Sequence, residues 1–137
     1  RDLTLTAGTG NIVFTGAVGT GASLEDILIN SATDVTFSLA VTAETITQVT
    51  GTGTTTFSGA VNANPLAPGL AVDLTGAAFT INSTVTTTNG GQVEITNAGL
   101  LTIAAAGDIA LRRMESGWFR RPVTLPRPMT TSASPQP

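Results

Sequence analysis

Apolar residues recur along this chain at a nearly constant spacing. One column of them is Phe14, Phe37, Phe57, Ile81 and Ile103, with steps of 23, 20, 24 and 22 residues. A pattern that repeats at such a spacing is typical of repeat architectures, in which each repeat is one structural unit. The step of about 22 residues predicts five units between residues 1 and 111.

Two further apolar columns recur in the same phase. The second column consists of Leu5, Ile29, Val49, Leu74 and Ile95, and the third of Val18, Val41, Val61 and Val85. The partners two residues before the second column are Leu3, Ile27, Val72 and Val93, and those before the first are Ile12, Val35, Phe79 and Leu101. In the third row these partner positions hold Thr47 and Thr55. Residues two apart in a strand face the same side, so each row predicts short strands that point their apolar side chains inward.

A chain that returns to the same corner after every row stacks one coil on the next. Each coil then pairs with its neighbours at the strand spacing of about 4.8 Å, and stability grows with the number of coils. This pattern predicts an all-β parallel solenoid with coils at about 1–22, 23–44, 45–69, 70–90 and 91–111. An antiparallel meander would instead need frequent two-residue Asn-Gly loops, and Asn89-Gly90 occurs once.

Glycine and proline mark the connections between these strands. Residues 8–18 and 51–61 share Gly-Thr-Gly, Phe and Gly-Ala-Val, and the glycines lie between the apolar columns, where turns are expected. Residues 62–69 form the longest break and carry two prolines, which predicts a loop that bulges from one corner. Binding residues concentrate on such loops, so the candidate contact residues are Asn62, Asn64, Pro65 and Pro68.

Composition narrows the chemistry. The chain has 26 Thr and 15 Gly, which suit half-buried strands and tight corners. It has no Cys, His or Lys, which removes disulfides, thiolate metal sites and the usual general bases and Schiff-base nucleophiles. Neither a cofactor nor a metal is expected, and the chain is not expected to be an enzyme.

Charge and hydropathy argue against two kinds of partner. Residues 2–111 contain eight acidic residues and no basic one, so this part is a poor surface for nucleic acid. No apolar run approaches the roughly 18 residues that a membrane span needs. The segment 112–137 differs, with five Arg, five of the seven Pro and the only Trp.

Three interpretations of residues 112–137 remain open. The segment could be a cap in which Trp118 and Phe119 cover the last coil, because open solenoid ends need such covers. It could instead be a linker, or an out-of-frame stretch in a gene fragment. The predicted division is therefore a solenoid at 1–111 and an Arg/Pro-rich tail at 112–137.

The repeats also carry a family resemblance. The opening Leu-Thr-Leu-Thr, the two Gly-Thr-Gly repeats and the phrase Ala-Gly-Leu-Leu-Thr-Ile-Ala-Ala-Ala-Gly-Asp-Ile at 98–109 resemble the passenger regions of bacterial exoproteins. These are filamentous-haemagglutinin-like adhesins, autotransporter passengers and large repeat-containing surface proteins. The resemblance implies a right-handed β-helix at the bacterial cell surface or outside the cell. It also implies a structural or adhesive role toward host-cell or matrix glycans and proteins.

Two other functions and one further partner are compatible with the pattern. A carbohydrate-binding or carbohydrate-processing β-helix would need clustered acids, for which Asp2 and Asp26 are the nearest candidates. These two carboxylates could bind a calcium ion between them, or they could simply be solvated side chains at a corner. An ice-binding solenoid would need Thr ranks on one face, and the Thr pairs 4/6, 45/47, 54/56 and 84/86 fall in different phases of the coil. End-to-end stacking of solenoids is the remaining expected partner interaction.

Overall fold

The regular elements of the structure, a computed structural model that describes residues 1–111, are all β-strands. The proposed cap residues Trp118 and Phe119 and the rest of 112–137 lie outside the described residues. Every strand pairing within residues 1–111 is parallel, as the sequence predicts. Parallel pairing between strands about one coil apart excludes the antiparallel meander.

The strands form three faces. The long face contains β1 (Leu3–Thr6), β3 (Leu24–Ser31), β5 (Val41–Gln48), β8 (Gly69–Gly76) and β11 (Gly91–Asn97). The short face contains β2 (Ile12–Phe14), β4 (Val35–Phe37), β6 (Thr54–Phe57), β9 (Ala78–Ile81) and β12 (Leu101–Ile103). The third face contains the first residues of β5, together with β7 (Val61–Ala63), β10 (Thr84–Thr87) and β13 (Asp108–Leu111). Strand β5 turns the corner between two faces, since Val41 pairs with β7 and Ile46 with β8.

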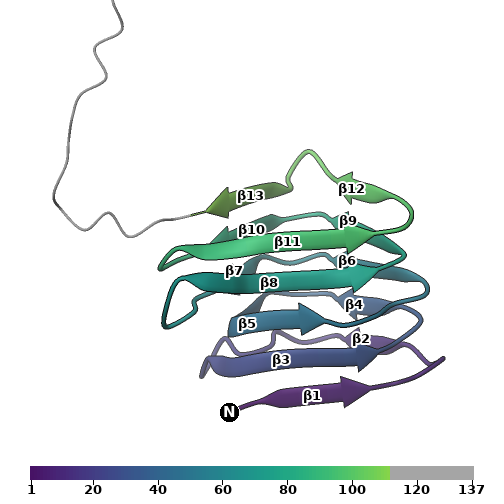
Figure 1. Ribbon diagram of the computed structural model, residues 1–137, viewed down its shortest axis with the longest axis horizontal. Helices are drawn as coiled ribbons and strands as arrows, with labels where there is room; N and C mark the ends of the chain where they lie inside the picture. The colour runs from purple at the N-terminus through teal and green to yellow at the C-terminus, as the bar shows by residue number, and fades with distance from the viewer. Residues whose placement is uncertain (112–137) are drawn as a thin grey trace, which may run out of the picture.

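The chain winds as a right-handed solenoid of about five coils. Figure 1 shows the long-face strands in front running one way and the short-face strands behind running back, while each coil rises above the one before it. Both the parallel pairing and the coil length of about 22 residues agree with the prediction from the apolar columns.

Two of the three predicted columns are confirmed residue by residue. Phe14 pairs with Phe37, Phe37 with Phe57, Phe57 with Ile81, and Ile81 with Ile103. The first two of these pairs stack their rings, with centroids 4.7 and 5.0 Å apart. On the third face, Val18, Val41, Val61 and Val85 follow one another in the same way, and Ile109 extends the column. Apolar side chains, several of them identical, therefore lie on one another along the axis and form the core.

The second column is wrong by one residue in the third coil. The residue that pairs with Ile29 and with Leu74 is Gln48, and Val49 is 53% exposed. The partner position in the same row holds Ile46, which pairs with Ile27, rather than Thr47. Thr55 does occupy its predicted inward position, between Val35 and Phe79. A column assigned from apolar residues alone passes over a buried glutamine, so the prediction placed Val49 in the column instead of Gln48.

The coils differ most at the corner between the third face and the long face. Six positions separate Thr87 from Val93 at this corner of the fourth coil. Ala43 pairs with Ala63 in the next coil, and Ile46 pairs with Val72. Three positions separate Ala43 from Ile46 along the chain, whereas nine separate Ala63 from Val72. The third coil therefore carries six extra residues at the corner between β7 and β8. The predicted loop is present there, but it is shorter than expected at both ends, because Asn62 lies within β7 and Gly69 begins β8.

Candidate functional site

The loop between β7 and β8, residues 64–68, is tied to the coil on each side of it. The backbone N–H of Asn64 donates to the Ala43 carbonyl over 2.8 Å. From the following coil, the Thr88 hydroxyl donates to Asn64 Oδ1 over 3.0 Å. Asn89 Nδ2 donates to the Pro65 carbonyl over 2.9 Å. Three hydrogen bonds thus hold the base of this loop, which is preorganised rather than free.

Beyond this base the loop presents apolar side chains to solvent. Leu66 is 84% exposed, and Ala67 and Pro68 are exposed beside it. Leu70, at the start of β8, is 44% exposed. Large apolar side chains held outward on a rigid base are typical of contact surfaces, because burying them in a partner costs little conformational entropy. We call residues 66–70 the apolar tip.

The four contact residues predicted from the sequence occupy different surroundings. Asn62 points outward from β7, half-buried and next to Thr42 and Thr86 in the neighbouring coils. Asn64 is half-buried and engaged with Thr88, and Pro65 is buried. Pro68 alone of the four belongs to the exposed tip. Leu66 was not among the predicted contact residues, although its position between two prolines was a signal in the sequence.

A column of threonines lines the outside of the short face. Thr36 pairs with Thr56, Thr56 with Thr80, and Thr80 with Thr102, and each is half-buried between inward-pointing neighbours. Val13 ends the column in the first coil. The Thr pairs considered in the sequence are indeed distributed over different faces, with Thr47 on the long face and Thr86 on the third. The column of single threonines, one per coil, was missed because only Thr-x-Thr pairs were considered.

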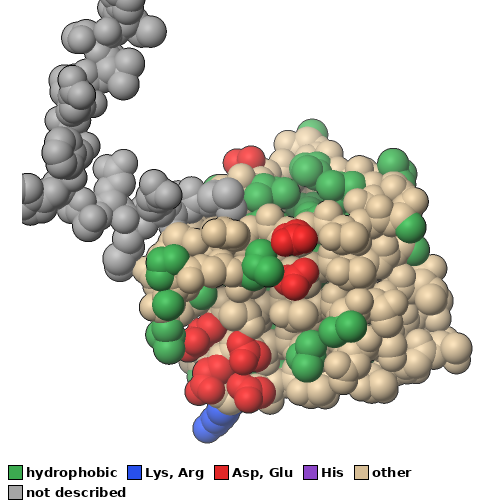
Figure 2. Space-filling view, in the orientation of Figure 1, with side chains coloured by type: hydrophobic (Ala, Val, Ile, Leu, Met, Phe, Trp, Pro, Cys, Tyr) green, Lys and Arg blue, Asp and Glu red, His purple; other side chains and the backbone are tan. Residues whose placement is uncertain are grey.

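Most acidic side chains of residues 1–111 lie on the long face and at its corners, and Asp108 begins β13 on the third face. Asp73 pairs with Glu94 in the next coil, so their side chains are neighbours on the outer surface. Asp2 and Asp26 precede the paired residues Leu3 and Ile27, which places them one above the other, and both are exposed. Figure 2 shows the acidic side chains gathered mainly beside the first coils.

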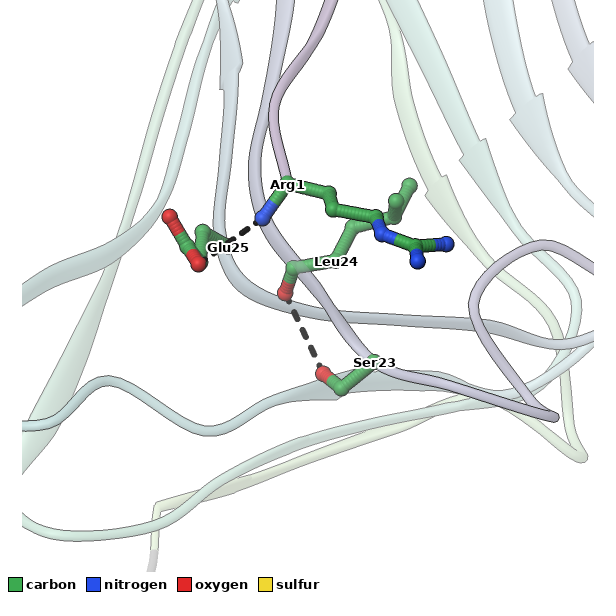
Figure 3. A network of polar contacts seen from close by, with 4 residues as sticks. All are labelled: Arg1, Ser23, Leu24 and Glu25. Atoms are coloured by element: carbon green, nitrogen blue, oxygen red, sulfur yellow. Dashed lines mark hydrogen bonds and ion pairs between the residues drawn. The ribbon is translucent and has the colours of Figure 1, made fainter.

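The corner near Asp26 has ordinary polar partners. The Thr45 hydroxyl donates to an Asp26 carboxylate oxygen. The amino group of Arg1 lies 2.8 Å from Glu25 Oε1, and the Ser23 hydroxyl donates to the Leu24 carbonyl (Figure 3). Within residues 1–111, no group of three or more acidic side chains is arranged to hold a metal ion. The Asp26 carboxylate is thus exposed and hydrogen-bonded to the neighbouring coil.

Comparison with known proteins assigns no family. No protein-family model matches the chain, no curated protein matches it, and no solved structure matches it. In the part of the chain that the structure describes, no helix has the length and apolar character needed to cross a membrane.

Proposed function

We propose that residues 1–111 are a structural segment of a repeat protein outside the cell or at its surface, and that the segment binds its partner through the apolar tip. The supporting observation is the contrast between a regular stack of coils and one six-residue insertion that the next coil holds in place. A stack of coils with packed side chains inside supplies length and stiffness. The insertion supplies a local, exposed surface at a defined position along that length.

The proposed partners are glycans or proteins of a host surface or matrix. The described surface is rich in hydroxyl and amide side chains, with acids and almost no basic charge. Such a surface is suited to neutral polar ligands around an apolar contact, and unsuited to polyanions. The proposed role is non-catalytic. Asp73 and Glu94, which lie opposite each other on neighbouring strands, face outward from the long face of the solenoid.

Binding to immobilised partners tests this proposal. The probes are a printed glycan array and surfaces coated with collagen or fibronectin, together with a screen for polysaccharide hydrolysis. We expect binding to at least one probe, a loss of about tenfold or more in the Leu66→Ser variant, as for a buried apolar anchor at an interface, and no hydrolysis. Leu100→Ser is the matched control, because Leu100 is also exposed (69%) but lies at a different corner.

Two outcomes would contradict the proposal. If Leu66→Ser and Leu100→Ser weaken binding equally, the contact is not at the apolar tip. If the protein hydrolyses a polysaccharide, the non-catalytic role is wrong and the carbohydrate-processing alternative replaces it.

Ice binding is a second candidate, favoured by the column of Thr36, Thr56, Thr80 and Thr102. Parallel strands repeat these side chains at about 4.8 Å, which gives a regular array of methyl and hydroxyl groups. The column two residues earlier contains Asp34, Thr54, Ala78 and Leu100, so a second threonine rank does not accompany the first. Thermal hysteresis in the wild-type protein that Thr56→Lys abolishes and Thr86→Lys preserves would support ice binding.

A further inference from the structure

The apolar tip lies beside acidic side chains of the long face. Leu66 is 84% and Leu70 44% exposed. Asp73 stands three positions after Leu70 in β8 and pairs with Glu94 of the next coil. Both carboxylates face outward, because the residues on either side of each belong to the core or pack against it. Figure 2 shows acidic side chains next to apolar ones on this face.

A third carboxylate lies below the loop. Glu44 follows Ala43, whose carbonyl accepts the N–H of Asn64 at the base of the loop. Glu44 is half-buried where β5 turns from the third face to the long face. We call Glu44, Asp73 and Glu94 the acidic margin. Residues 2–111 contain no Lys or Arg to balance these charges, so the tip and its margin suit a partner that combines apolar and cationic side chains.

Residues 112–137 of the same chain have this composition. They hold five of the six basic residues of the chain and one acid, whereas residues 2–111 hold eight acids and no base. Arginine pairs at 112–113 and 120–121 flank the aromatic residues Trp118 and Phe119. Aromatic residues and arginine are the types enriched at protein interfaces. The tail is therefore complementary to the tip and its margin in both charge and hydropathy.

The tail also begins within reach of the tip. Leu111 pairs with Thr87, and Thr87 pairs with Ala63, the last residue of β7. Two strand spacings, about 10 Å, thus separate Leu111 from the residue after which the loop begins. An extended chain covers about 3.3 Å per residue, so about three residues span that distance. Trp118 lies seven positions after Leu111 and can reach Leu66 without any change in the solenoid.

We propose that residues 112–137 fold back over the apolar tip of the same chain. Trp118 and Phe119 cover the tip rather than the last coil, and the flanking arginines lie opposite the acidic margin. The aromatic side chains supply most of the buried apolar area, and the charges fix the orientation of the tail. An external partner of the tip competes with the tail, but the tail contact itself does not depend on such a partner.

Acrylamide quenching of Trp118 fluorescence tests the proposal in the full chain, which has no other Trp and no Tyr. A synthetic peptide of residues 112–137 gives the quenching constant of an accessible indole. We expect the wild-type constant to lie well below that of the peptide and Leu66→Ser to raise it to the peptide value. Leu100→Ser is the matched control, because Leu100 is exposed at a different corner and its replacement should leave quenching unchanged.

Removal of charge tests the acidic margin separately. Glu44→Gln combined with Asp73→Asn removes two margin carboxylates and should raise the quenching constant. Asp2→Asn combined with Asp108→Asn removes two carboxylates elsewhere and should leave it unchanged. Salt at about 1 M, where the Debye length is about 3 Å, should act as the first double variant does. Circular dichroism melting of each variant reports whether its fold is retained.

Four results would overturn the proposal. Wild-type quenching equal to that of the peptide means that the tail does not cover the tip. Protection that persists in Leu66→Ser places Trp118 on another surface, such as the last coil. Protection that appears only as protein concentration rises makes the contact one between copies. Equal effects of the two double variants remove the pairing of the arginines with the acidic margin. None of these results bears on the proposed function, which is tested by binding to external probes.

Discussion

The Thr55 hydroxyl donates a hydrogen bond to Gln48 Oε1 over 2.8 Å inside the third coil, where both side chains are almost fully buried. Gln48 Nε2 donates in turn to the Thr75 carbonyl of the next coil, over 3.3 Å. No buried side-chain nitrogen or oxygen of residues 1–111 lacks a partner. In the fourth coil the same two columns hold the buried residues Leu74 and Phe79, so this polar pair takes the place of two apolar side chains.

Replacing both members of this pair should destabilise the solenoid by less than the sum of the two single replacements. Gln48→Leu introduces a residue found in this column in other coils, but it leaves the Thr55 hydroxyl buried without its partner, at a cost of about 1–3 kcal/mol. Thr55→Val leaves the Gln48 amide oxygen without its donor, while Gln48 Nε2 keeps the Thr75 carbonyl. The double variant should lose less free energy of unfolding than the two single losses added together, because only the Thr75 carbonyl then lacks its donor. Denaturant unfolding of all four proteins measures the coupling, and strictly additive single effects would contradict this account.

Two equivalent glycines of the repeat should differ in their tolerance of alanine. A Cβ on Gly59 would lie 2.2 Å from the Leu39 carbonyl carbon and 2.4 Å from the Ala40 nitrogen, which are backbone atoms of the coil below. A Cβ on Gly16, 43 residues earlier in the repeat, meets nothing within 4 Å. We expect Gly59→Ala to lower the free energy of unfolding by about 1–3 kcal/mol or more, and Gly16→Ala to change it by less than about 0.5 kcal/mol.

Chemical denaturation of the two glycine variants checks this difference. The contrast follows from stacking alone, since both glycines stand in the same Phe-x-Gly-Ala-Val context. Equal effects would mean that the second coil does not lie directly under the third.

The base of the apolar tip should depend on Asn89. This residue has a φ of 52° and donates to the Pro65 carbonyl. Asn89→Ala loses that bond and adds the strain of a left-handed conformation, so it should cost about 2 kcal/mol. Asn89→Gly accepts the conformation, and its loss should stay near 1 kcal/mol.

Amide hydrogen exchange shows which residues are loosened by the two Asn89 substitutions. Exchange should accelerate at residues 64–70 in both variants, while β4 and β6 keep their protection, because the loop opens without the core. If residues 64–70 exchange as slowly in Asn89→Ala as in the wild type, the loop is held by other contacts.

The sequence predicted those parts of the fold that depend on apolar repetition. The phenylalanine and valine columns could be read directly, because parallel stacking places like side chains on each other. Gln48 could not be placed, since its burial depends on Thr55 from the same coil and a carbonyl from the next. The existence of the loop was predictable from its prolines, but its exposed tip at Leu66 was not. Thr88 and Asn89 hold the loop through hydrogen bonds to residues 24 positions earlier in the chain, and no local sequence pattern predicts such contacts.

The stacking of coils in the register of the phenylalanine column is tested most directly by paired cysteines on the outer threonine column. The chain contains no cysteine, so an introduced pair has no competitor. Thr36→Cys with Thr56→Cys places the two cysteines opposite each other on adjacent strands, with Cα atoms about 4.8 Å apart, within the Cα range of a disulfide. Thr36→Cys with Thr80→Cys places them two strands apart, at about twice that distance and beyond that range. We predict rapid intramolecular oxidation of the first pair and none of the second; equal oxidation of both pairs, or of neither, would contradict the stacked solenoid.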